Sequence, residues 1–246
     1  MMTGPDKAVA GKARLLSGDG AAIGAALELG PSRSYLIAKR GLDLIISFLA
    51  LLLFSPLILI VAVAIRLDSP GPVLFGQERV GYDRRTGART RFRMYKLRSM
   101  YQNNDDRSHR EHVTELITNG FPPAGGGGPT HVKMRNDQRV TRVGRILRKT
   151  SIDELPQLWN VLRGDMSLVG PRPPLPYEVA VYSPHHLQRL GAVPGCTGLW
   201  QVSGWYVIGF EEMVAIDIYY IQHRSLRLDL TILLKTVLLL LGRRGG

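Results

Sequence analysis

Residues 44–65 read LIISFLALLLFSPLILIVAVAI and contain no charged side chain. Only Ser47, Ser55 and Pro56 interrupt the apolar run. An α-helix of this length would extend roughly 33 Å, which is close to the thickness of the hydrocarbon core of a bilayer. The stretch follows a long polar segment and precedes no small-residue cleavage site, so it does not read as a secretory signal. The sequence therefore predicts a membrane helix; the alternative is a buried core helix of a soluble protein.

Both flanks of this segment are basic, which bears on how it enters the membrane. Lysine and arginine favour the cytoplasmic side of a membrane. A proline inside a helix removes one backbone hydrogen bond and kinks the helix, and the hydroxyl of Ser55 can bond a carbonyl that the kink frees. We predict a re-entrant helix-break-helix over residues 35–67 that bends at Ser55-Pro56 and keeps both ends in the cytoplasm. A kinked helix that spans the membrane is the alternative. The flanking charges are Arg33, Lys39 and Arg40 before the segment and Arg66, Arg79, Arg84 and Arg85 after it.

Composition limits the class of protein. With 45% hydrophobic and 21% charged residues, a chain of 246 residues can form a folded core and is not mainly disordered. The 32 Lys and Arg against 20 Asp and Glu give a net charge of +12, which implies an anionic partner such as nucleic acid, a phospholipid surface or a phosphorylated substrate. A single cysteine, Cys196, excludes an internal disulfide framework and a multi-cysteine zinc site.

The remaining segments predict an α+β protein that is mostly helical. Residues 1–34 are rich in Gly, Ala and Ser and predict a disordered tail. Apolar and basic residues alternate over 91–98, as in a strand with two unlike faces. Residues 101–135 are polar, contain PPAGGGGP, and predict a flexible loop. Residues 225–241 predict an amphipathic helix, either on the membrane surface or packed on the soluble core.

The stretch Ser151-Ile152-Asp153-Glu154 carries two readings. It matches a capping box, with Ser151 as the N-cap and Glu154 at the third helical position. In the other reading, Asp153 is an ionised nucleophile toward phosphorus, favoured by the helix N-terminus and by the preceding Arg145 and Arg148. Glu154 would then share a Mg²⁺ ion with Asp153, because Mg²⁺ takes oxygen ligands from one or two carboxylates and from substrate phosphates.

Several longer motifs identify a family. They are KRGLDLIIS at 39–47, YKLRSM at 95–100, SIDELPQ at 151–157, MSLVGPRP at 166–173 and PGCTGLWQVSG at 194–204. The chain resembles the monotopic phosphoglycosyl transferases, a bacterial sugar transferase family, from about Ser34 to Leu241, and in particular their short exopolysaccharide-type members. SIDELPQ followed by MSLVGPRP at this separation is specific to the family.

The resemblance implies an enzyme that transfers a sugar 1-phosphate from a UDP-sugar to polyprenyl (undecaprenyl) phosphate and releases UMP. Glucose and galactose are the expected sugars. The family works by a ping-pong mechanism through a phosphosugar bound to the aspartate of the Asp-Glu pair, here Asp153, with Mg²⁺ on Asp153 and Glu154. The resemblance also places a small catalytic domain, residues 68–246, with amphipathic surface helices, on the cytoplasmic face of the bacterial inner membrane.

Basic residues in the matching motifs are expected to bind the substrate phosphates, because arginine can donate hydrogen bonds to two phosphate oxygens at once. Contacts of these side chains with lipid headgroups are the alternative. The first choices are Lys96, Arg98, Arg148 and Arg172, and the second choices are Arg139 and Arg145.

One motif departs from the family. Family members usually carry Arg-Asn after the Ser203-Gly204 pair, whereas this chain has Trp205-Tyr206. The change removes an expected donor-binding cation, so the motif does not identify the transferred sugar. The sequence does not indicate the oligomeric state either. A membrane-surface scaffold or a nucleic-acid-binding membrane protein would be a different class of function. Neither accounts for SIDELPQ together with VGPRP, so no nucleic-acid partner is expected.

Overall fold

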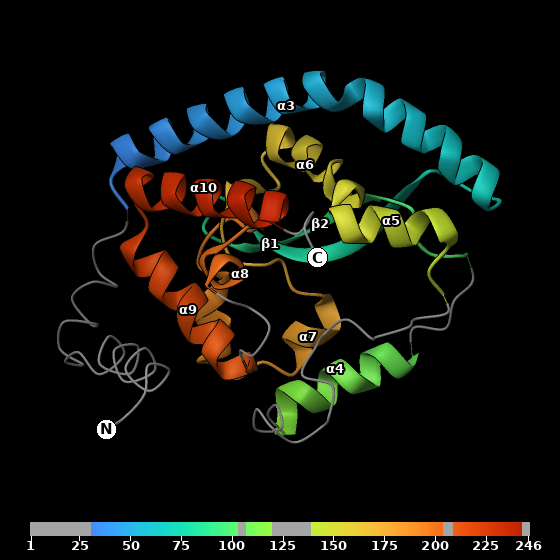
Figure 1. Ribbon diagram of the computed structural model, residues 1–246. Helices are drawn as coiled ribbons and strands as arrows, with labels where there is room; N and C mark the ends of the chain where they lie inside the picture. The colour runs from blue at the N-terminus through green and yellow to red at the C-terminus, as the bar shows by residue number, and fades with distance from the viewer. Residues whose placement is uncertain (1–30, 103–106, 120–138, 204–208, 243–246) are drawn as a thin grey trace, which may run out of the picture.

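The computed structural model describes residues 31–102, 107–119, 139–203 and 209–242. Figure 1 shows one long helix, α3, that arches over a compact arrangement of shorter helices and two small sheets. The α+β, mostly helical class is confirmed. In chain order the elements are α3 (Arg33–Asp68), β1 (Leu74–Tyr82), β2 (Arg89–Leu97), α4 (Arg107–Asn119), α5 (Arg142–Thr150), the 3₁₀ helix η1 (Ile152–Glu154), α6 (Gln157–Arg163), β3 (Ser167–Val169), α7 (Pro176–Ala180), the 3₁₀ helix η2 (His186–Leu190), β4 (Gly195–Thr197), α8 (Leu199–Val202), α9 (Phe210–His223) and α10 (Leu226–Gly242).

The long helix α3 is continuous through its proline. Ser32 caps its N-terminus by accepting a hydrogen bond from the Tyr35 backbone amide at 3.2 Å. Pro56 has no N–H to donate to the carbonyl of Leu52, and the Ser55 hydroxyl donates to that carbonyl instead, at 2.8 Å. The expected use of Ser55 is therefore confirmed. The predicted interruption of the helix is wrong: α3 stays α-helical across Ser55-Pro56 and bends in its middle (Figure 1).

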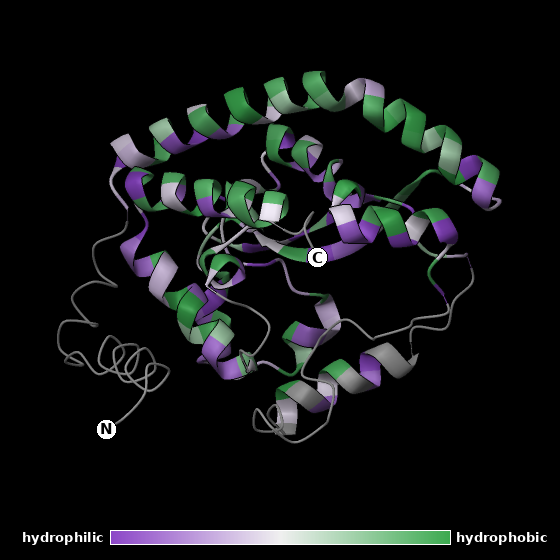
Figure 2. Cartoon of the chain, in the orientation of Figure 1, coloured by the Kyte–Doolittle hydropathy of each residue, from purple (hydrophilic) through white to green (hydrophobic). Residues whose placement is uncertain are grey.

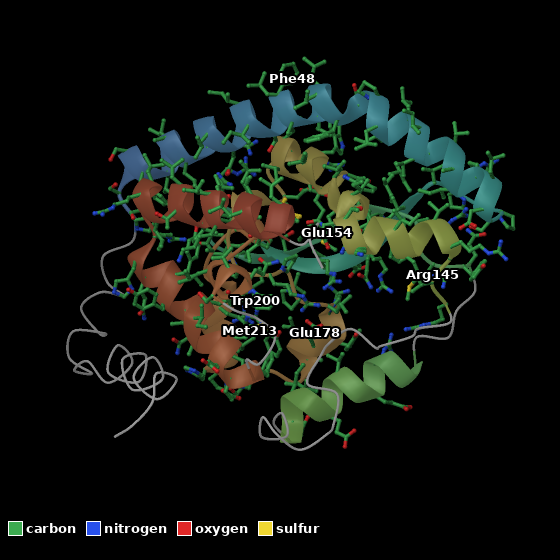
Figure 3. All side chains as sticks on the ribbon, viewed as in Figure 1. Phe48, Arg145, Glu154, Glu178, Trp200 and Met213 are labelled. Atoms are coloured by element: carbon green, nitrogen blue, oxygen red, sulfur yellow. The ribbon has the colours of Figure 1, made fainter. Side chains whose placement is uncertain are left out.

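The two sides of α3 have opposite characters. The side turned toward the rest of the protein carries its buried residues, which include Lys39, Asp43 and Ile65. The outer side is apolar and exposed, with Phe48 projecting from the arch (Figures 2 and 3). Among the described residues, α3 is the helix long and apolar enough to cross a membrane, and only 11% of its most apolar stretch is buried. A core helix of a soluble protein would be mostly buried, so the apolar face indicates a membrane-bound protein.

The hairpin β1–β2 confirms the strand expected over 91–98. The strands pair antiparallel, from Leu74 opposite Leu97 to Tyr82 opposite Arg89. Phe92 and Met94 point into the core, where they pack with Val161 and other residues of α6, β3, α9 and α10, while the alternating Arg91 and Arg93 stay exposed. Alternation with a period of two therefore separated a core face from a basic face.

The polar segment 101–135 is not wholly a loop, which corrects the prediction. Residues 107–119 form α4, and Val113 and Ile117, one helical turn apart, are buried against Phe210, Met213 and Val214 of α9. Two apolar residues at this spacing lie on one face of the helix and dock it on α9. Residues 103–106 and 120–135 of the predicted loop lie outside the described residues, as do residues 1–30 of the predicted tail.

The C-terminal helix α10 packs on the soluble core, which is one of its two expected placements, and the membrane placement stays a prediction. Its inner face packs on the core: Ile232 is fully buried, and Asp229 accepts hydrogen bonds from the hydroxyls of Tyr35, at 3.0 Å, and Tyr220, at 2.7 Å. Its outer face exposes a row of leucines and a valine, and α10 runs beside the N-terminal half of α3 (Figure 1). The exposed row consists of Leu230, Leu234, Val237, Leu238, Leu239, Leu240 and Leu241.

Candidate active site

The acidic pair lies on η1, in the short connection between α5 and α6. Ser151 adopts a left-handed conformation, with φ of 58°, and its backbone amide closes α5 on the carbonyl of Leu147. Its side chain makes no capping hydrogen bond to η1, so Ser151 ends α5 and does not form the predicted capping box. Asp153 is buried, with 7% of the residue exposed. Glu154, which the capping reading assigned to a helix N-terminus, is partly exposed near the centre of the molecule (Figure 3).

Lys96 forms an ion pair with Glu154. Its ammonium group contacts Glu154 Oε1 at 2.8 Å, and both side chains are about one-quarter to one-third exposed, at 26% and 37%. Asn160 of α6 holds the strand that carries Lys96: its Oδ1 accepts from the Tyr95 amide at 3.0 Å, and its Nδ2 donates to the Arg93 carbonyl at 2.8 Å. Asn160 is fully buried, so the spacing between Lys96 and the acidic pair is fixed by the core.

Arg172 projects from the loop that joins β3 to α7. Its Nη1 lies 3.3 Å from Glu178 Oε2, and its side chain is 23% exposed. The same Glu178 oxygen accepts from the Leu175 amide at 3.0 Å. Burial opposes the ionisation of Glu178, but the guanidinium groups of Arg172 and Arg79 hold the pKa of this carboxyl below its ordinary value.

Arg79 is a site residue that sequence reasoning missed, because it was counted among the basic residues that flank the membrane helix. The structure buries it, with 7% exposed, on β1. Its Nη1 donates to the Pro173 carbonyl at 2.9 Å, and its Nη2 donates to Gln77 Oε1 at 2.6 Å. Burial, followed by the nearby Arg172, lowers the pKa of Arg79 to about 10, so it remains charged at neutral pH. Glu178, which had no assigned role, was missed too; its position six residues after Arg172 gives no sequence signal of their contact.

The other predicted phosphate-binding residues lie in different surroundings. Arg98 is buried, and its guanidinium donates to the carbonyls of Pro70, at 2.6 Å, Ser69, at 2.6 Å, and Ile65, at 3.3 Å, which gives it a structural role at the end of α3. Arg148 is half-buried near the end of α5, and Arg145 is exposed on the same helix (Figure 3). 

Arg139 lies just before α5, where its carbonyl accepts from the Tyr101 amide at 2.9 Å. The departure at Trp205-Tyr206 lies outside the described residues. No structural observation tests the assignment of these arginines to substrate phosphates, and the assignment stays a prediction.

The acidic pair fits a magnesium ion by the chemistry of its donors. Two adjacent carboxylates supply hard oxygen ligands, and Mg²⁺ commonly binds one or two carboxylates and completes its shell with water and substrate phosphates. Over residues 31–102, 107–119, 139–203 and 209–242, no group of three or more His, Cys, Asp or Glu side chains is placed to hold a metal. Two carboxylates would leave most of the coordination shell of Mg²⁺ to water and substrate phosphates.

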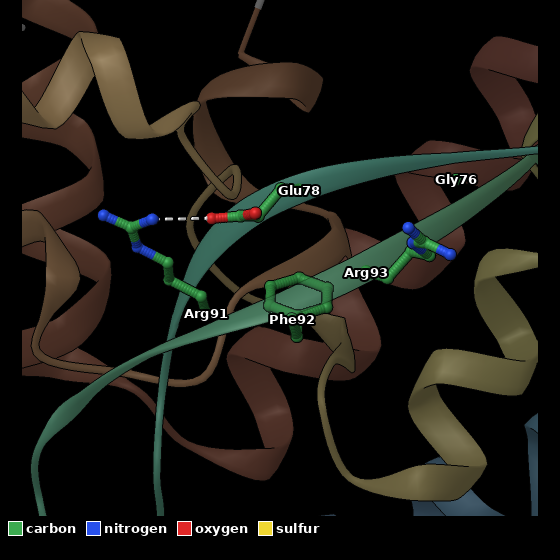
Figure 4. A pocket seen from close by; sticks show the side chains of 5 residues that line it. All are labelled: Gly76, Glu78, Arg91, Phe92 and Arg93. Atoms are coloured by element: carbon green, nitrogen blue, oxygen red, sulfur yellow. Dashed lines mark hydrogen bonds and ion pairs between the residues drawn. The ribbon is translucent and has the colours of Figure 1, made fainter.

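An open pocket of about 420 Å³ lies elsewhere, on the hairpin. Glu78 and Arg91 face each other across it in an ion pair of 2.9 Å (Figure 4). The acidic pair does not line this pocket, so it is not the expected reaction site. Its lining residues are Gly76, Glu78, Arg91, Phe92 and Arg93.

Comparison with known proteins agrees with the motifs. The profile of the family described as bacterial sugar transferase matches residues 34–243. The exopolysaccharide production protein ExoY of Sinorhizobium fredii is 39% identical over 210 residues, which are 85% of this chain and 88% of ExoY. The UDP-glucose:undecaprenyl-phosphate glucose-1-phosphate transferase of Caulobacter vibrioides is 45% identical over 82% of this chain and 68% of its own length. The undecaprenyl-phosphate galactose phosphotransferase of Salmonella typhimurium is 41% identical over 87% of this chain and 42% of its own length. The chain therefore belongs to the bacterial sugar transferase family, and it is a phosphoglycosyl transferase.

Proposed function

We propose that the enzyme transfers a sugar 1-phosphate from a UDP-sugar to polyprenyl phosphate, with release of UMP, as the first step of exopolysaccharide or related glycan assembly. The observation that carries the proposal is the buried Asp153 beside Glu154 and Lys96 in a chain whose relatives are named for this transfer. The relatives' names include both glucose and galactose transferases, which supports UDP-glucose or UDP-galactose as the donor.

The reaction runs as a double displacement. A carboxylate oxygen of Asp153 attacks the sugar-bearing phosphorus of the donor, a new O–P bond forms, and the bond to UMP breaks. A phosphate oxygen of the lipid acceptor then attacks the same phosphorus, and the bond to Asp153 breaks. The acceptor phosphate is already ionised near neutral pH and hardly needs a general base, which favours a nucleophilic role for Asp153.

The donor diphosphate carries several negative charges, so attack by a carboxylate requires cations around it. Mg²⁺ held by Asp153 and Glu154 would neutralise part of the phosphate charge. Lys96 and Arg172 are partly exposed and are the first candidates for the phosphate oxygens, followed by Arg148. Arg145 and Arg139 remain second choices. Arg98 is the weakest candidate because its guanidinium is engaged with backbone carbonyls.

The proposed topology is re-entrant, with the catalytic domain on the cytoplasmic face of the bacterial inner membrane. Both ends of α3 contact the same domain: Arg40 donates to the Val161 carbonyl at 2.6 Å, and the Ile65 carbonyl near the other end accepts from Arg98. This arrangement supports a helix whose two ends stay on one side of the bilayer. An Arg33→Cys variant should resist a membrane-impermeant thiol reagent applied to intact cells. Labelling from the periplasm would exclude the re-entrant topology.

The function is tested by UMP release from purified protein. Repeated turnover should require the donor, Mg²⁺ and polyprenyl phosphate, and a panel of UDP-glucose, UDP-galactose and UDP-N-acetyl sugars identifies the sugar. Without the acceptor, at most about one UMP per site should appear, and the peptide that contains residues 151–158 should gain the mass of one sugar phosphate.

Asp153→Asn should lower turnover by several orders of magnitude, whereas Asp83→Asn, the same change at the start of the hairpin turn, should not. Substantial turnover by folded Asp153→Asn would exclude the covalent mechanism. Initial-rate plots that intersect would indicate that both substrates bind together.

A further inference from the structure

The loop that carries Arg172 is fixed from both sides by backbone hydrogen bonds. On one side, the Gly170 amide donates to the Thr197 carbonyl and the Gly195 amide donates to the Pro171 carbonyl, each at 2.9 Å. On the other side, the Val80 amide of β1 donates to the Pro174 carbonyl at 3.0 Å. A Cβ at position 170 would come within 2.4 Å of the Val193 carbonyl oxygen, so only glycine permits this approach.

Two buried side chains complete the support. Arg79 donates to the Pro173 carbonyl, the residue directly after Arg172. Glu178, with 2% exposed, accepts from the Leu175 amide and from Arg172 itself. A buried guanidinium and a buried carboxylate are costly to desolvate, so their retention here calls for a role beyond packing.

The charges of this cluster are unbalanced. Arg79 and Arg172 carry two positive charges, and Glu178 carries one negative charge. Of the three guanidinium nitrogens of Arg172, Glu178 engages Nη1, and the described part of the chain shows no hydrogen bond from the other two. Nη2 and Nε of Arg172 therefore remain available to an anion, and arginine commonly binds phosphate through two nitrogens. The hairpin links the cluster to the acidic pair: Arg79 lies on β1, and Lys96, whose ammonium is 2.8 Å from Glu154, lies on the paired strand β2.

We propose that Arg79 and Glu178 are positioning residues that orient Arg172 toward the diphosphate of the nucleotide-sugar donor. The inference rests on the proposed function, since it deepens the account of the donor site. Arg79 fixes the backbone beside Arg172, and Glu178 fixes the side chain by holding one edge of its guanidinium. The free edge then needs no reorientation when a phosphate binds, which lowers the entropic cost of binding.

The test measures the affinity of the full chain for UDP, in detergent with Mg²⁺, by isothermal titration calorimetry. UDP carries the diphosphate, and its binding requires no turnover. Glu178→Gln keeps an acceptor for the Leu175 amide but loses the charge that holds Arg172, and it should weaken UDP binding about tenfold. Glu212→Gln, the same change at an exposed position in the first turn of α9, is the matched control and should leave the affinity unchanged.

A double-mutant cycle separates positioning from general stability. In an Arg172→Ala background, Glu178→Gln should have almost no further effect on UDP affinity, because the residue that it orients is gone. Equal effects in the two backgrounds, or wild-type affinity in Glu178→Gln, would overturn the proposal. Failure of the wild type to bind UDP would overturn it as well.

Arg79→Lys provides a second variant if Glu178→Gln does not fold. It keeps the charge but cannot bridge both the Pro173 carbonyl and Gln77, so it should also weaken UDP binding severalfold, again only when Arg172 is present. Wild-type affinity in folded Arg79→Lys would overturn the role of Arg79. Wild-type protein that binds UDP through Arg172 but releases no UMP from any UDP-sugar would refute the proposed function and leave the positioning role standing.

Discussion

Substitution of Asp43 by asparagine should destabilise the protein more than any surface change. Asp43 is fully buried where α3 meets β3. It accepts from the Ser167 hydroxyl at 2.9 Å and the Leu168 amide at 3.1 Å, and it pairs with Lys39 at 3.4 Å and Arg84 at 3.3 Å. Removing one member of a buried ion pair costs about 3–5 kcal/mol. We expect the lower end, about 3 kcal/mol, because Lys39 keeps Asp229 as a second counter-charge at 3.4 Å and the side chain of Arg84 is 30% exposed. At roughly 2–4 °C per kcal/mol for a chain of this size, the melting temperature should fall by about 6–12 °C.

Thermal unfolding of the detergent-solubilised protein, followed by circular dichroism, measures this loss. Asp83→Asn is the matched control: Asp83 is half-buried at the start of the hairpin turn, where it accepts from the Arg85 amide at 2.7 Å. Asparagine keeps an oxygen that can accept this hydrogen bond, so the control should leave the melting temperature nearly unchanged. If Asp43→Asn is as stable as this control, the buried charges do not fasten α3 to the catalytic domain and the reasoning is wrong.

Three further changes test other parts of the structure. Gly144→Ala should destabilise the protein by about 1–3 kcal/mol in chemical denaturation, because its Cβ would lie 2.0 Å from the Ser99 carbonyl oxygen; an unchanged midpoint would contradict that packing. Ile117→Ala should cost about 2–5 kcal/mol of local stability and release α4 to proteolysis, whereas equal protease resistance would show that α4 does not depend on this contact. Because Arg172 and Arg79 lower the pKa of Glu178 despite its burial, its carboxylate stabilises the fold above the ordinary pKa of 4.5, and this contribution is lost as the pH falls below that value. Melting temperatures between about pH 5 and 3 should therefore fall less steeply in Glu178→Gln than in the wild type, and parallel curves would contradict the shift.

The sequence predicted those features that depend on local patterns. The apolar run 44–65 and the alternation over 91–98 are signals of neighbouring residues, and both elements appear in the structure. The helix α4 was missed because it lies in a polar segment and the described residues that dock it, Val113 and Ile117, contact partners on α9 about one hundred positions away. A contact of that range leaves no trace in the local pattern.

The candidate site was predicted in its motifs but not in its contacts. SIDELPQ and VGPRP pointed to Asp153 and Arg172 as candidate site residues. Three other basic residues share a positive charge but have different roles in the structure. Arg79 supports a loop, Arg98 binds the carbonyls at the end of α3, and Lys96 pairs with Glu154. A count of charges in the sequence cannot distinguish these roles, because the burial and the partners of each side chain are set by tertiary packing.

The membrane helix and the acidic pair are joined by a short chain of direct contacts. Arg40 of α3 donates to the carbonyls of Val161 and Leu162 at the end of α6, at 2.6 and 2.8 Å, and α6 lies under the middle of α3 (Figure 1). The next link is Asn160, which precedes Val161 and hydrogen-bonds the backbone of β2 at Arg93 and Tyr95. Lys96 follows Tyr95 on β2 and pairs with Glu154. These links join buried or half-buried groups, so they fix the position of the acidic pair relative to α3. If α3 lies in the membrane and the acidic pair reacts as proposed, the same contacts would hold the reacting carboxylate at a fixed height above the lipid surface, where the phosphate of a polyprenyl acceptor would lie.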